Sequence, residues 1–368
     1  MLYILLFVFI GIVSIQFIYY VIIFGKFSFY KSLQIQTKRI AVSVIVCAKN
    51  EEENVKTLIP LLLKQDYFDY EIVLIDNSSS DNTLDIFEEF EKINNNIKIV
   101  RVVNNETFWG NKKYALTLGI KAAKNDYLIF TDADCYPTSK NWIKEMSSQF
   151  TLKKTIVLGY GGYEKISNSF LNKLIRFETL LTATQYFSWA KIGFPYMGVG
   201  RNLAYKKDEF FSINGFIEHM KIRSGDDDLF INQAANKSNI TFNYNKESST
   251  YSKPKTKYSE WFIQKRNHVS TAQHYKSFDR FQLSLFFISQ VLFFVFAIIL
   301  LALQFNWIIV LSLIVFRYLF TWISLSYSAK NLAEKDVMYW YPFLEIALLL
   351  TQINAFITNK FSKPAQWK

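Results

Sequence analysis

Long apolar stretches flank a more polar middle portion of this 368-residue chain, and they constrain its fold most strongly. Met1–Phe24 carries no charged side chain, and Phe281–Phe305 and Trp307–Leu325 follow the polar portion. About 20 apolar residues suffice to cross a bilayer as a helix, so each run is long enough to span. The first run lacks a basic n-region and a small-residue cleavage site, which favours an uncleaved anchor over a signal peptide. We expect a membrane anchor at residues 1–25 and a C-terminal membrane region at residues 281–361.

The last segment of that region, Tyr341–Phe361, contains Glu345, Gln352 and Asn354. A complete crossing would place the C-terminal lysines outside, against the positive-inside bias. We therefore expect two to three C-terminal membrane helices, with this segment lying at the interface rather than spanning. Arg317, near the middle of the third run, needs a partner such as Glu345, or it snorkels to the interface.

Charge and cysteine content indicate the side of the membrane and the class of partner. The basic residues directly after the first run are Lys26, Lys31, Lys38 and Arg39. The positive-inside rule places them in the cytoplasm, and the two scattered thiols of Cys47 and Cys135 fit a reducing compartment. The net charge of +11 suits an anionic membrane. Because neither a zinc pattern nor a basic groove-binding helix is found, we expect no nucleic acid partner.

Strand-like and helix-like segments alternate through residues 40–276. We expect strands at Ile40–Cys47, Tyr70–Ile75, Ile97–Val103, Tyr127–Phe130, Ile156–Tyr160, Asn202–Tyr205 and Ile240–Tyr244. We expect helices at Glu51–Lys64, Asp81–Lys92, Asn111–Ala123, Asn168–Ala190, Asp226–Ala235 and Trp261–Tyr275. This alternation predicts an α/β domain whose mostly parallel sheet is covered by helices.

The stretch Leu128–Cys135 ends an apolar strand in two carboxylates, Asp132 and Asp134. Residues two apart on a strand share a side, and ligands of open α/β sheets bind at the carboxyl ends of the strands. Two such carboxylates suit a divalent cation, although an isolated D-x-D motif also occurs in solvated acidic turns.

Acids also follow two other predicted strands. The first strand leads into A-K-N-E-E with Glu51, and the second ends in D-N-S-S-S-D-N-T, which begins at Asp76. In a parallel sheet these acids reach the same edge as Asp132, where they can accept hydrogen bonds from a base or a ribose. Asp81 is explained by default as a helix cap.

Several further charged residues have both a functional and an ordinary explanation. Lys112 and Lys113 open a helix and could approach phosphates, or simply be solvated. The segment S-G-D-D-D-L-F has more acids than a helix start needs, and one of them could take a proton from a hydroxyl. Arg266 and His268 could donate to a diphosphate, or form a basic face towards an anionic membrane.

Together these segments resemble the membrane-attached branch of the family 2 glycosyltransferases, which have the GT-A fold. The resemblance covers roughly residues 41–275 and rests on V-S-V-I-V-C-A-K-N-E-E, E-I-V-L-I-D-N-S-S-S-D-N-T, N-K-K-Y-A-L, T-D-A-D and G-D-D-D-L-F. It implies a GT-A-like mixed, mostly parallel sheet, a nucleotide-sugar donor with a UDP-sugar favoured, and Mg²⁺ or Mn²⁺ as cofactor.

The resemblance also implies a role for each matching residue. Glu51 and Asp76 would contact base and ribose, Lys112 would hold the place of the family's G-K-x-x-A-L lysine, Asp132 would contact ribose or metal, and Asp134 would ligate the metal. Aligning Leu229 with the family's E-D-x-D-L pattern makes Asp226 the catalytic base and Asp227 the near alternative, with Gly225 in place of the Glu. Arg266 and His268 would bind the donor diphosphate.

The expected activity is inverting transfer of one hexosyl group to a lipid or lipid-linked hydroxyl, in cell envelope biosynthesis at the cytoplasmic face of a bacterial plasma membrane. Single transfer is favoured because Asn267 and His268 stand where processive synthases have Arg and Trp. Gly193–Arg201, with its glycines, is the expected lid. The alternatives are a polyprenyl-phosphate sugar synthase, a non-catalytic membrane protein that binds nucleotide sugars, and a nucleotidyltransferase.

Overall fold

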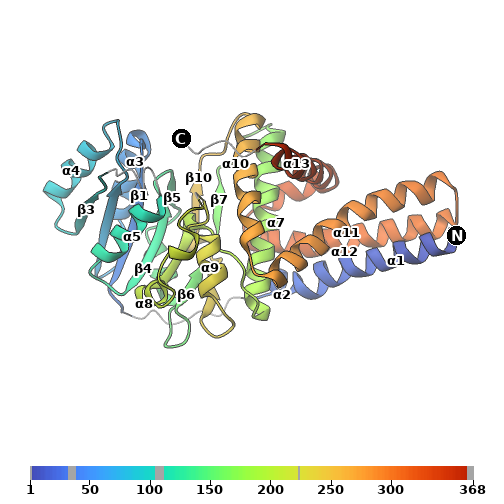
Figure 1. The fold of residues 1–368 in the computed structure, drawn as a ribbon, viewed down its shortest axis with the longest axis horizontal. Coiled ribbons are helices and arrows are strands. Elements are labelled where there is room, and N and C mark those ends of the chain that lie inside the picture. The colour runs from blue at the N-terminus through green and yellow to red at the C-terminus, as the bar shows by residue number, and fades with distance from the viewer. Residues whose placement is uncertain (1, 32–38, 104–111, 223, 363–368) are drawn as a thin grey trace. The chain divides into compact units, whose positions relative to one another are not determined.

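The computed structural model describes residues 2–31, 39–103, 112–222 and 224–362, which form two compact units (Figure 1). The α/β unit comprises Ser32–Ser167 and Gly193–Lys255, and the helical unit comprises Met1–Lys31, Asn168–Ile192 and Thr256–Lys368. Two helices from the predicted 40–276 domain, at Phe170–Ile192 and Tyr258–Thr271, therefore group with the membrane segments.

The α/β unit alternates strands and helices, with η marking short 3₁₀ or π-helical segments. Its elements are β1 (Val42–Ala48), α3 (Glu52–Leu63), β2 (Tyr70–Asp76), α4 (Thr83–Ile93), β3 (Ile97–Arg101), α5 (Lys112–Ala122), β4 (Tyr127–Asp132), β5 (Cys135–Pro137), α6 (Trp142–Ser148), β6 (Ile156–Leu158), β7 (Gly161–Tyr163), η2 (Gly200–Asn202), β8 (Leu203–Lys206), α8 (Lys207–Ser212), η3 (Ile217–His219), α9 (Asp228–Ala234), β9 (Ile240–Phe242), η4 (Lys246–Ser248) and β10 (Thr250–Ser252).

The main sheet of the described residues has seven strands in the order β3-β2-β1-β4-β8-β6-β9. Strand β1 pairs in parallel with β2 and β4, β2 with β3, and β6 with β9. Only β8 runs antiparallel to both of its neighbours, β4 and β6. The expected mixed, mostly parallel sheet is confirmed.

Helices cover both faces of this sheet. On one face, alternate residues of β1 join a hydrophobic cluster with α3, α4 and α6; they are Val42, Val44 and Val46. On the other face α5 lies very close, because a Cβ on Gly119 would come within 2.2 Å of Ile75 Cδ1. A glycine at this position lets α5 lie directly against Ile75 of β2, where any larger side chain would clash.

A second sheet of three strands, in the order β5-β10-β7, was not predicted. Each of its strands has three residues, too few for an alternating pattern to be recognised. Cys135, which opens β5, is paired with Ser252 and so fixes the chain directly after the acidic strand end.

The longest helices of the described residues belong to the helical unit. They are α1 (Leu2–Phe17) with η1 (Ile18–Ile23) and α2 (Gly25–Ser28), α7 (Phe170–Ile192), α10 (Tyr258–Thr271) with η5 (Ala272–His274), α11 (Ser277–Ala302), α12 (Trp307–Asn331), η6 (Lys335–Trp340) and α13 (Tyr341–Phe361). Among the described residues, four stretches are long and apolar enough to cross a membrane: Leu2–Ser28, Ser277–Ala302, Trp307–Asn331 and Lys335–Phe361.

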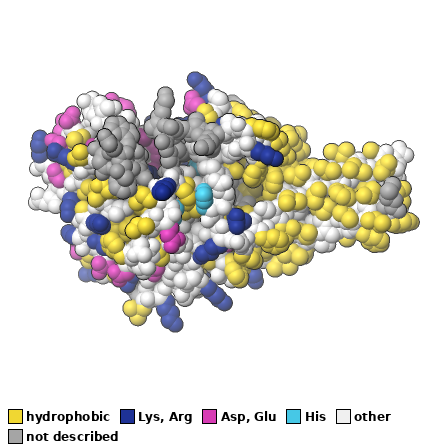
Figure 2. Space-filling view, in the orientation of Figure 1, with side chains coloured by type: hydrophobic (Ala, Val, Ile, Leu, Met, Phe, Trp, Pro, Cys, Tyr) yellow, Lys and Arg dark blue, Asp and Glu magenta, His cyan; other side chains and the backbone are white. Residues whose placement is uncertain are grey.

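Three of these helices, α1, α11 and α12, lie side by side as a bundle (Figure 1). Their visible surface is hydrophobic almost throughout in Figure 2, and large apolar side chains such as Phe7 and Ile298 are each 67% exposed. Such a surface suits lipid rather than water. The fourth candidate, α13, instead packs on α10 and α7, and Arg266 donates to Asn359 Oδ1 at 2.8 Å.

Arg317 is buried inside this unit and has an ionic partner. Its guanidinium donates to both carboxylate oxygens of Glu345, to Gln16 Oε1 at 2.7 Å and to Tyr341 Oη at 3.2 Å. Arg317 is 0% and Glu345 4% exposed, so the pair connects α12 and α13 and the Gln16 bond adds α1. Of the two explanations for this charge, the partnered one is observed, not snorkelling.

We expect Arg317→Met to destabilise the protein by about 3–5 kcal/mol, because it leaves the Glu345 carboxylate buried without its cation. The double variant R317M/E345M should recover most of that loss, since it removes both charges. Thermal unfolding of the purified protein in detergent measures both effects. Equal loss in the single and double variants would contradict the ion-pair explanation.

Candidate functional site

The carboxyl ends of three neighbouring parallel strands bring two of the predicted acids together. Strand register pairs Ala48 with Asp76 on one side of β1 and Cys47 with Asp132 on the other. Asp76 and Asp132 therefore flank the end of β1 at one edge of the sheet. This is the edge at which ligands bind in open α/β sheets.

Lys112, in the first turn of α5, joins the end of β4 to the turn formed by residues 225–227 before α9, which we call the acidic turn. Its Nζ lies 2.7 Å from Asp132 Oδ1 and 3.0 Å from Asp226 Oδ2. These side chains line one pocket together with Thr131 and Asp227. Although burial opposes it, the pair of carboxylates holds the pKa of Lys112 well above its usual value. Residues more than 90 positions apart in sequence thus form one ionic cluster.

The acidic turn has a backbone that a glycine makes possible. Gly225 has a φ of +91°, and α9 begins three residues later at Asp228. Side chains with a Cβ rarely adopt this conformation, so the Glu of the related pattern would be strained here. The turn directs Asp226 to Lys112, while Asp227 Oδ2 accepts a hydrogen bond from the Gly200 N–H at 2.6 Å.

The first two carboxylates of this turn differ in acidity. Burial would raise the pKa of Asp226, but the Lys112 ammonium outweighs it and the pKa is lowered. Burial, with the charges of Asp226 and Asp228, raises the pKa of Asp227 to about 7. Asp226 is therefore ionised at neutral pH, and Asp227 titrates near it.

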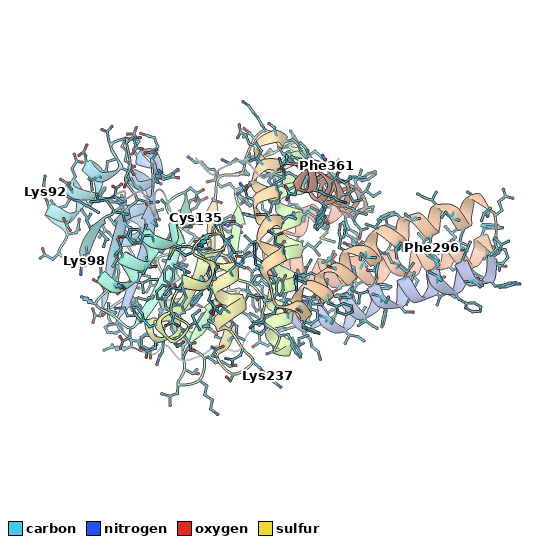
Figure 3. The ribbon with its side chains drawn as sticks, viewed as in Figure 1. Lys92, Lys98, Cys135, Lys237, Phe296 and Phe361 are labelled. Carbon is cyan, nitrogen blue, oxygen red and sulfur yellow. The ribbon has the colours of Figure 1, made fainter. Side chains whose placement is uncertain are left out.

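The residues Asp132, Asp134 and Cys135 place their ligand atoms within 4.8 Å of one another. Burial together with the charge of Asp132 raises the pKa of Asp134, a crowding that a bound cation would relieve. Burial also holds the pKa of the Cys135 thiol well above its usual value, and its Sγ donates to Asp134 Oδ1 at 3.4 Å. Because the thiol stays protonated, the donor set is two carboxylates, which fits Mg²⁺ or Mn²⁺. Figure 3 labels Cys135, which directly follows these acids.

Glu51 lies among several of the acids just described. Burial raises its pKa, and the charges of Asp134, Asp132 and Asp81 add to the effect. Its Oε2 accepts a hydrogen bond from Asn54 Nδ2 at 2.6 Å. The side chain is thus part of the same acidic edge and remains accessible to a ligand.

Asp76 and Asp81 have different local roles. Asp76 is 4% exposed, and its Oδ1 accepts from the Ser79 N–H at 3.2 Å. Asp81 Oδ1 accepts from the N–H and the hydroxyl of Thr83 at the start of α4, and its Oδ2 accepts from the Glu52 N–H at 3.2 Å. The residue directly before α4 is Asn82, so Asp81 binds the start of the helix from one position earlier than the expected cap.

The glycine-containing loop 193–201 is attached to the acidic turn at Gly200. In the same loop, the Arg201 guanidinium lies over the Tyr163 ring, 4.4 Å from its centroid. Its positive charge also interacts with the negative charges of Asp134 and Asp132. Whether the loop closes over a ligand stays a prediction.

Two predicted site residues lie in the helical unit. Arg266 and His268 belong to α10, so the acidic cluster of the α/β unit does not include them. The Arg266 guanidinium bonds within its own unit, to Asn359 Oδ1 and to the carbonyl and hydroxyl of Ser362 at 2.7–2.8 Å.

Sequence reasoning missed Gly200 and Arg201 as neighbours of the acids, and it left Lys113 with two explanations. No spacing rule relates a loop glycine to a carboxylate 27 residues later, because only the tertiary fold brings Gly200 to Asp227. Burial could not have been predicted for Lys113 either, since its neighbour Lys112 is 37% exposed.

Comparisons with known proteins give this site a family context. Residues 43–212 match the model of the family described as Glycosyl transferase family 2. The dolichyl N-acetyl-alpha-D-glucosaminyl phosphate 3-beta-D-2,3-diacetamido-2,3-dideoxy-beta-D-glucuronosyltransferase of Methanococcus voltae is 30% identical over 160 residues, which cover 42% of this chain and 49% of that protein. The UDP-Glc:alpha-D-GlcNAc-diphosphoundecaprenol beta-1,3-glucosyltransferase of Escherichia coli is 33% identical over 131 residues, which cover 35% and 47%. The chain thus spans about half the length of these relatives.

A solved structure shows the same fold. The mannosyltransferase from Pyrobaculum calidifontis in complex with GDP-Man and Mn²⁺ aligns over 99% of this chain and 100% of its own, with a TM-score of 0.61 and 16% identity. At this identity the likeness concerns the fold alone.

The acidities of the two carboxylates predict opposite pH dependences of stability. Between its ordinary pKa of 3.8 and about 7, Asp227 keeps its proton in the folded state but loses it in the unfolded state. The folding stability of the natural protein therefore falls as pH rises through this window. The stability of Asp227→Asn relative to the natural protein should therefore increase from pH 4 to pH 7. Thermal unfolding in buffers across this range measures the change.

Asp226→Asn is the matched control for this measurement. In the natural protein the pKa of Asp226 is lowered in the folded state, so this carboxylate stabilises the fold above its ordinary pKa of 3.8. That stabilisation is lost as pH falls below this value. Asp226→Asn should thus be less stable than the natural protein at pH 7. Because the Asp226 charge is only one of the causes that raise the pKa of Asp227, any gain of this variant between pH 4 and 7 should be smaller than that of Asp227→Asn. An equal or larger gain in Asp226→Asn would contradict the assigned acidities.

Proposed function

Because the chain carries a family 2 glycosyltransferase domain with the GT-A fold, as its motifs predicted, we propose that it transfers one sugar from a nucleotide-sugar donor to a lipid-linked hydroxyl with inversion. The observation that carries the proposal is the cluster of Lys112, Asp132 and Asp226, which forms one pocket at the carboxyl edge of the sheet. A metal-binding acid, a phosphate-binding lysine and a base are the groups that such a transfer needs.

The donor would lie along the strand ends. Glu51 and Asp76 accept hydrogen bonds from the base and the ribose in this proposal, and Asp132 from the ribose or through the metal. A UDP-sugar is the favoured donor, and the Escherichia coli relative is named as using UDP-Glc. Arg266 and His268 are proposed as further donors to the diphosphate.

Asp134, with Asp132, would hold a divalent cation, as the crowded carboxylates fit this group. When bound there, Mg²⁺ or Mn²⁺ would supply positive charge that stabilises the diphosphate leaving group. The Pyrobaculum calidifontis protein of the same fold is described with Mn²⁺, which supports the presence of a metal and leaves its identity open.

Asp226 is the proposed catalytic base. It is ionised and paired with Lys112, and a diphosphate offers that ammonium a stronger anion, which would leave the carboxylate to the acceptor. The carboxylate then takes the proton of the acceptor hydroxyl while its oxygen forms a bond to the anomeric carbon. The bond from that carbon to the diphosphate breaks, and the nucleoside diphosphate leaves on the opposite side.

Asp227 remains the alternative base. Its pKa of about 7 suits proton transfer at neutral pH, but both of its oxygens accept backbone hydrogen bonds, from Gly200 and Asp228. This attachment favours a role in holding the loop.

The acceptor class follows from the membrane helices. Both curated relatives carry a dolichyl or undecaprenol lipid in their names, and four candidate spans would keep this chain at a bilayer. We therefore propose a polyprenyl-linked saccharide as acceptor, in cell envelope biosynthesis at the cytoplasmic face of a bacterial plasma membrane. The basic residues in the last turn of the first span and directly after it, Lys26 and Lys31 among them, support this side.

Asp226→Asn should abolish transfer and leave donor binding intact, because the carboxamide cannot accept the proton. Asp227→Asn should retain transfer if Asp226 is the base. The assay combines purified protein, a labelled nucleotide sugar and a polyprenyl-diphosphate-linked saccharide, with mass spectrometry of the lipid product and thermal-shift measurement of donor binding.

The pH profile of the natural protein discriminates between the two bases. With Asp226 as base, the rate stays level from pH 6 to 8, whereas a base with a pKa of about 7 produces a rising limb there.

Polyprenol phosphate is the second acceptor in the assay: transfer to it instead of the saccharide would establish the sugar-phosphate synthase alternative. Transfer by Asp226→Asn would contradict the assignment.

Chelation should remove the activity, and Mg²⁺ or Mn²⁺ should restore it. Asp134→Asn should raise the metal concentration needed for half-maximal rate by about 10-fold or more, since one charged ligand is lost. Titration of both metals in the transfer assay measures this shift. Activity that survives chelation and is unchanged in Asp134→Asn would contradict the metal site.

A further inference from the structure

Lys113 is a fully buried lysine directly beside the proposed donor-binding lysine. Its exposed fraction is 0%, and Nζ lies 2.8 Å from the carbonyl oxygen of His219, 2.9 Å from that of Ile222 and 2.8 Å from that of Ser224. Lysine is almost never buried in this way unless its charge is compensated. An ammonium group has three N–H donors, and three backbone carbonyls receive them here.

The carbonyls that Lys113 contacts belong to the segment that leads into the acidic turn. The described residues between η3 and Gly225 belong to no strand, and Asp226 follows Gly225 directly. Carbonyls outside a regular ladder need donors from elsewhere when they are buried. Lys113 supplies these donors within seven residues of Asp226.

The first turn of α5 therefore contacts the acidic turn twice. Lys112 contacts the carboxylate of Asp226, and Lys113 contacts the backbone that carries this residue. Both lysines begin the same helix, so a shift of α5 would move both contacts together. Gly119 fixes this helix against Ile75 of the strand that ends in Asp76.

We infer that Lys113 is a positioning residue, which sets the acidic turn relative to the donor-binding strand ends. The inference rests on the proposed sugar transfer, with Asp226 as its base. Lys113 does not touch the reacting atoms in this role. It holds the backbone at Ser224, so that the Asp226 carboxylate lies at the pocket.

The electrostatics of the site are consistent with this role. Burial lowers the pKa of Lys113 to about 8, against the opposing charges of Asp226, Asp228 and Asp227. The group thus still carries its proton at neutral pH, where it can donate to all three carbonyls. Gln has fewer donors and no charge, and the planar fork of Arg does not match three converging acceptors.

Lys113→Met tests the inference, with Lys121→Met as the matched control on the exposed face of the same helix. We expect kcat to fall about 100-fold in Lys113→Met with the donor KM unchanged, because a base displaced by about 1 Å loses this much rate. The control should retain both constants. Unchanged kcat in Lys113→Met, or a donor KM that rises in parallel with the loss, would overturn the inference.

Chemical rescue distinguishes positioning from general stability. Lys113→Ala should regain rate with added ethylammonium or butylammonium, which supply N–H donors to the vacated carbonyls, and not with tetramethylammonium, which has none. Thermal unfolding is measured in parallel, with Lys113→Gln as a third, polar and uncharged variant. A loss of kcat that follows the loss of melting temperature through the three variants, without rescue, would overturn the inference.

Hydrogen exchange gives a readout that does not depend on transfer. In Lys113→Met, amides of residues 217–228 should exchange faster, while those of β1 and β2 stay protected. If the natural protein transfers no sugar, the proposed function fails, but this exchange result still tests whether Lys113 holds the turn. Unchanged exchange in this segment would overturn the positioning role.

Discussion

The α/β unit depends on one ionic contact for its site: Lys112 lies between Asp132 at the end of β4 and Asp226 in the turn before α9. Burial would raise the pKa of the Asp226 carboxyl, and the ammonium of Lys112 outweighs this effect and lowers it. The contact therefore keeps the proposed base charged and holds it near the strand ends. A donor diphosphate that attracts Lys112 would weaken the contact between this ammonium and the Asp226 carboxylate when the donor binds.

The backbone around this contact is as specific as the charges. Gly225 permits the turn, the Gly200 N–H holds Asp227, and Lys113 holds the carbonyls upstream. These contacts use main-chain groups, so they fix position without adding a second reactive side chain. The two neighbouring acids differ in acidity for another reason: Lys112 lowers the pKa of Asp226, whereas burial and the adjacent carboxylates raise that of Asp227 to about 7.

The helical unit also contains buried charges, and here they neutralise each other as an ion pair. Arg317 and Glu345 are buried among apolar helices, where either charge alone would be very costly. Their pairing, with Gln16 and Tyr341 as further partners, links α1, α12 and α13. This link joins α13 to the bundle despite its lower hydropathy, and its packing on α10 adds a second attachment.

The sequence by itself determined the alternating strands and helices, the membrane-length runs and the acids at the strand ends, because apolar periodicity and strand-end chemistry are local properties. It also placed Lys112, Asp134 and Asp226 in one family pattern. Only the tertiary structure decided the short β5-β10-β7 sheet, the grouping of α7 and α10 with the membrane helices, and the burial of Lys113. These features depend on contacts between residues far apart in the chain, and two adjacent lysines have the same local propensity until such contacts bury one and leave the other at the pocket.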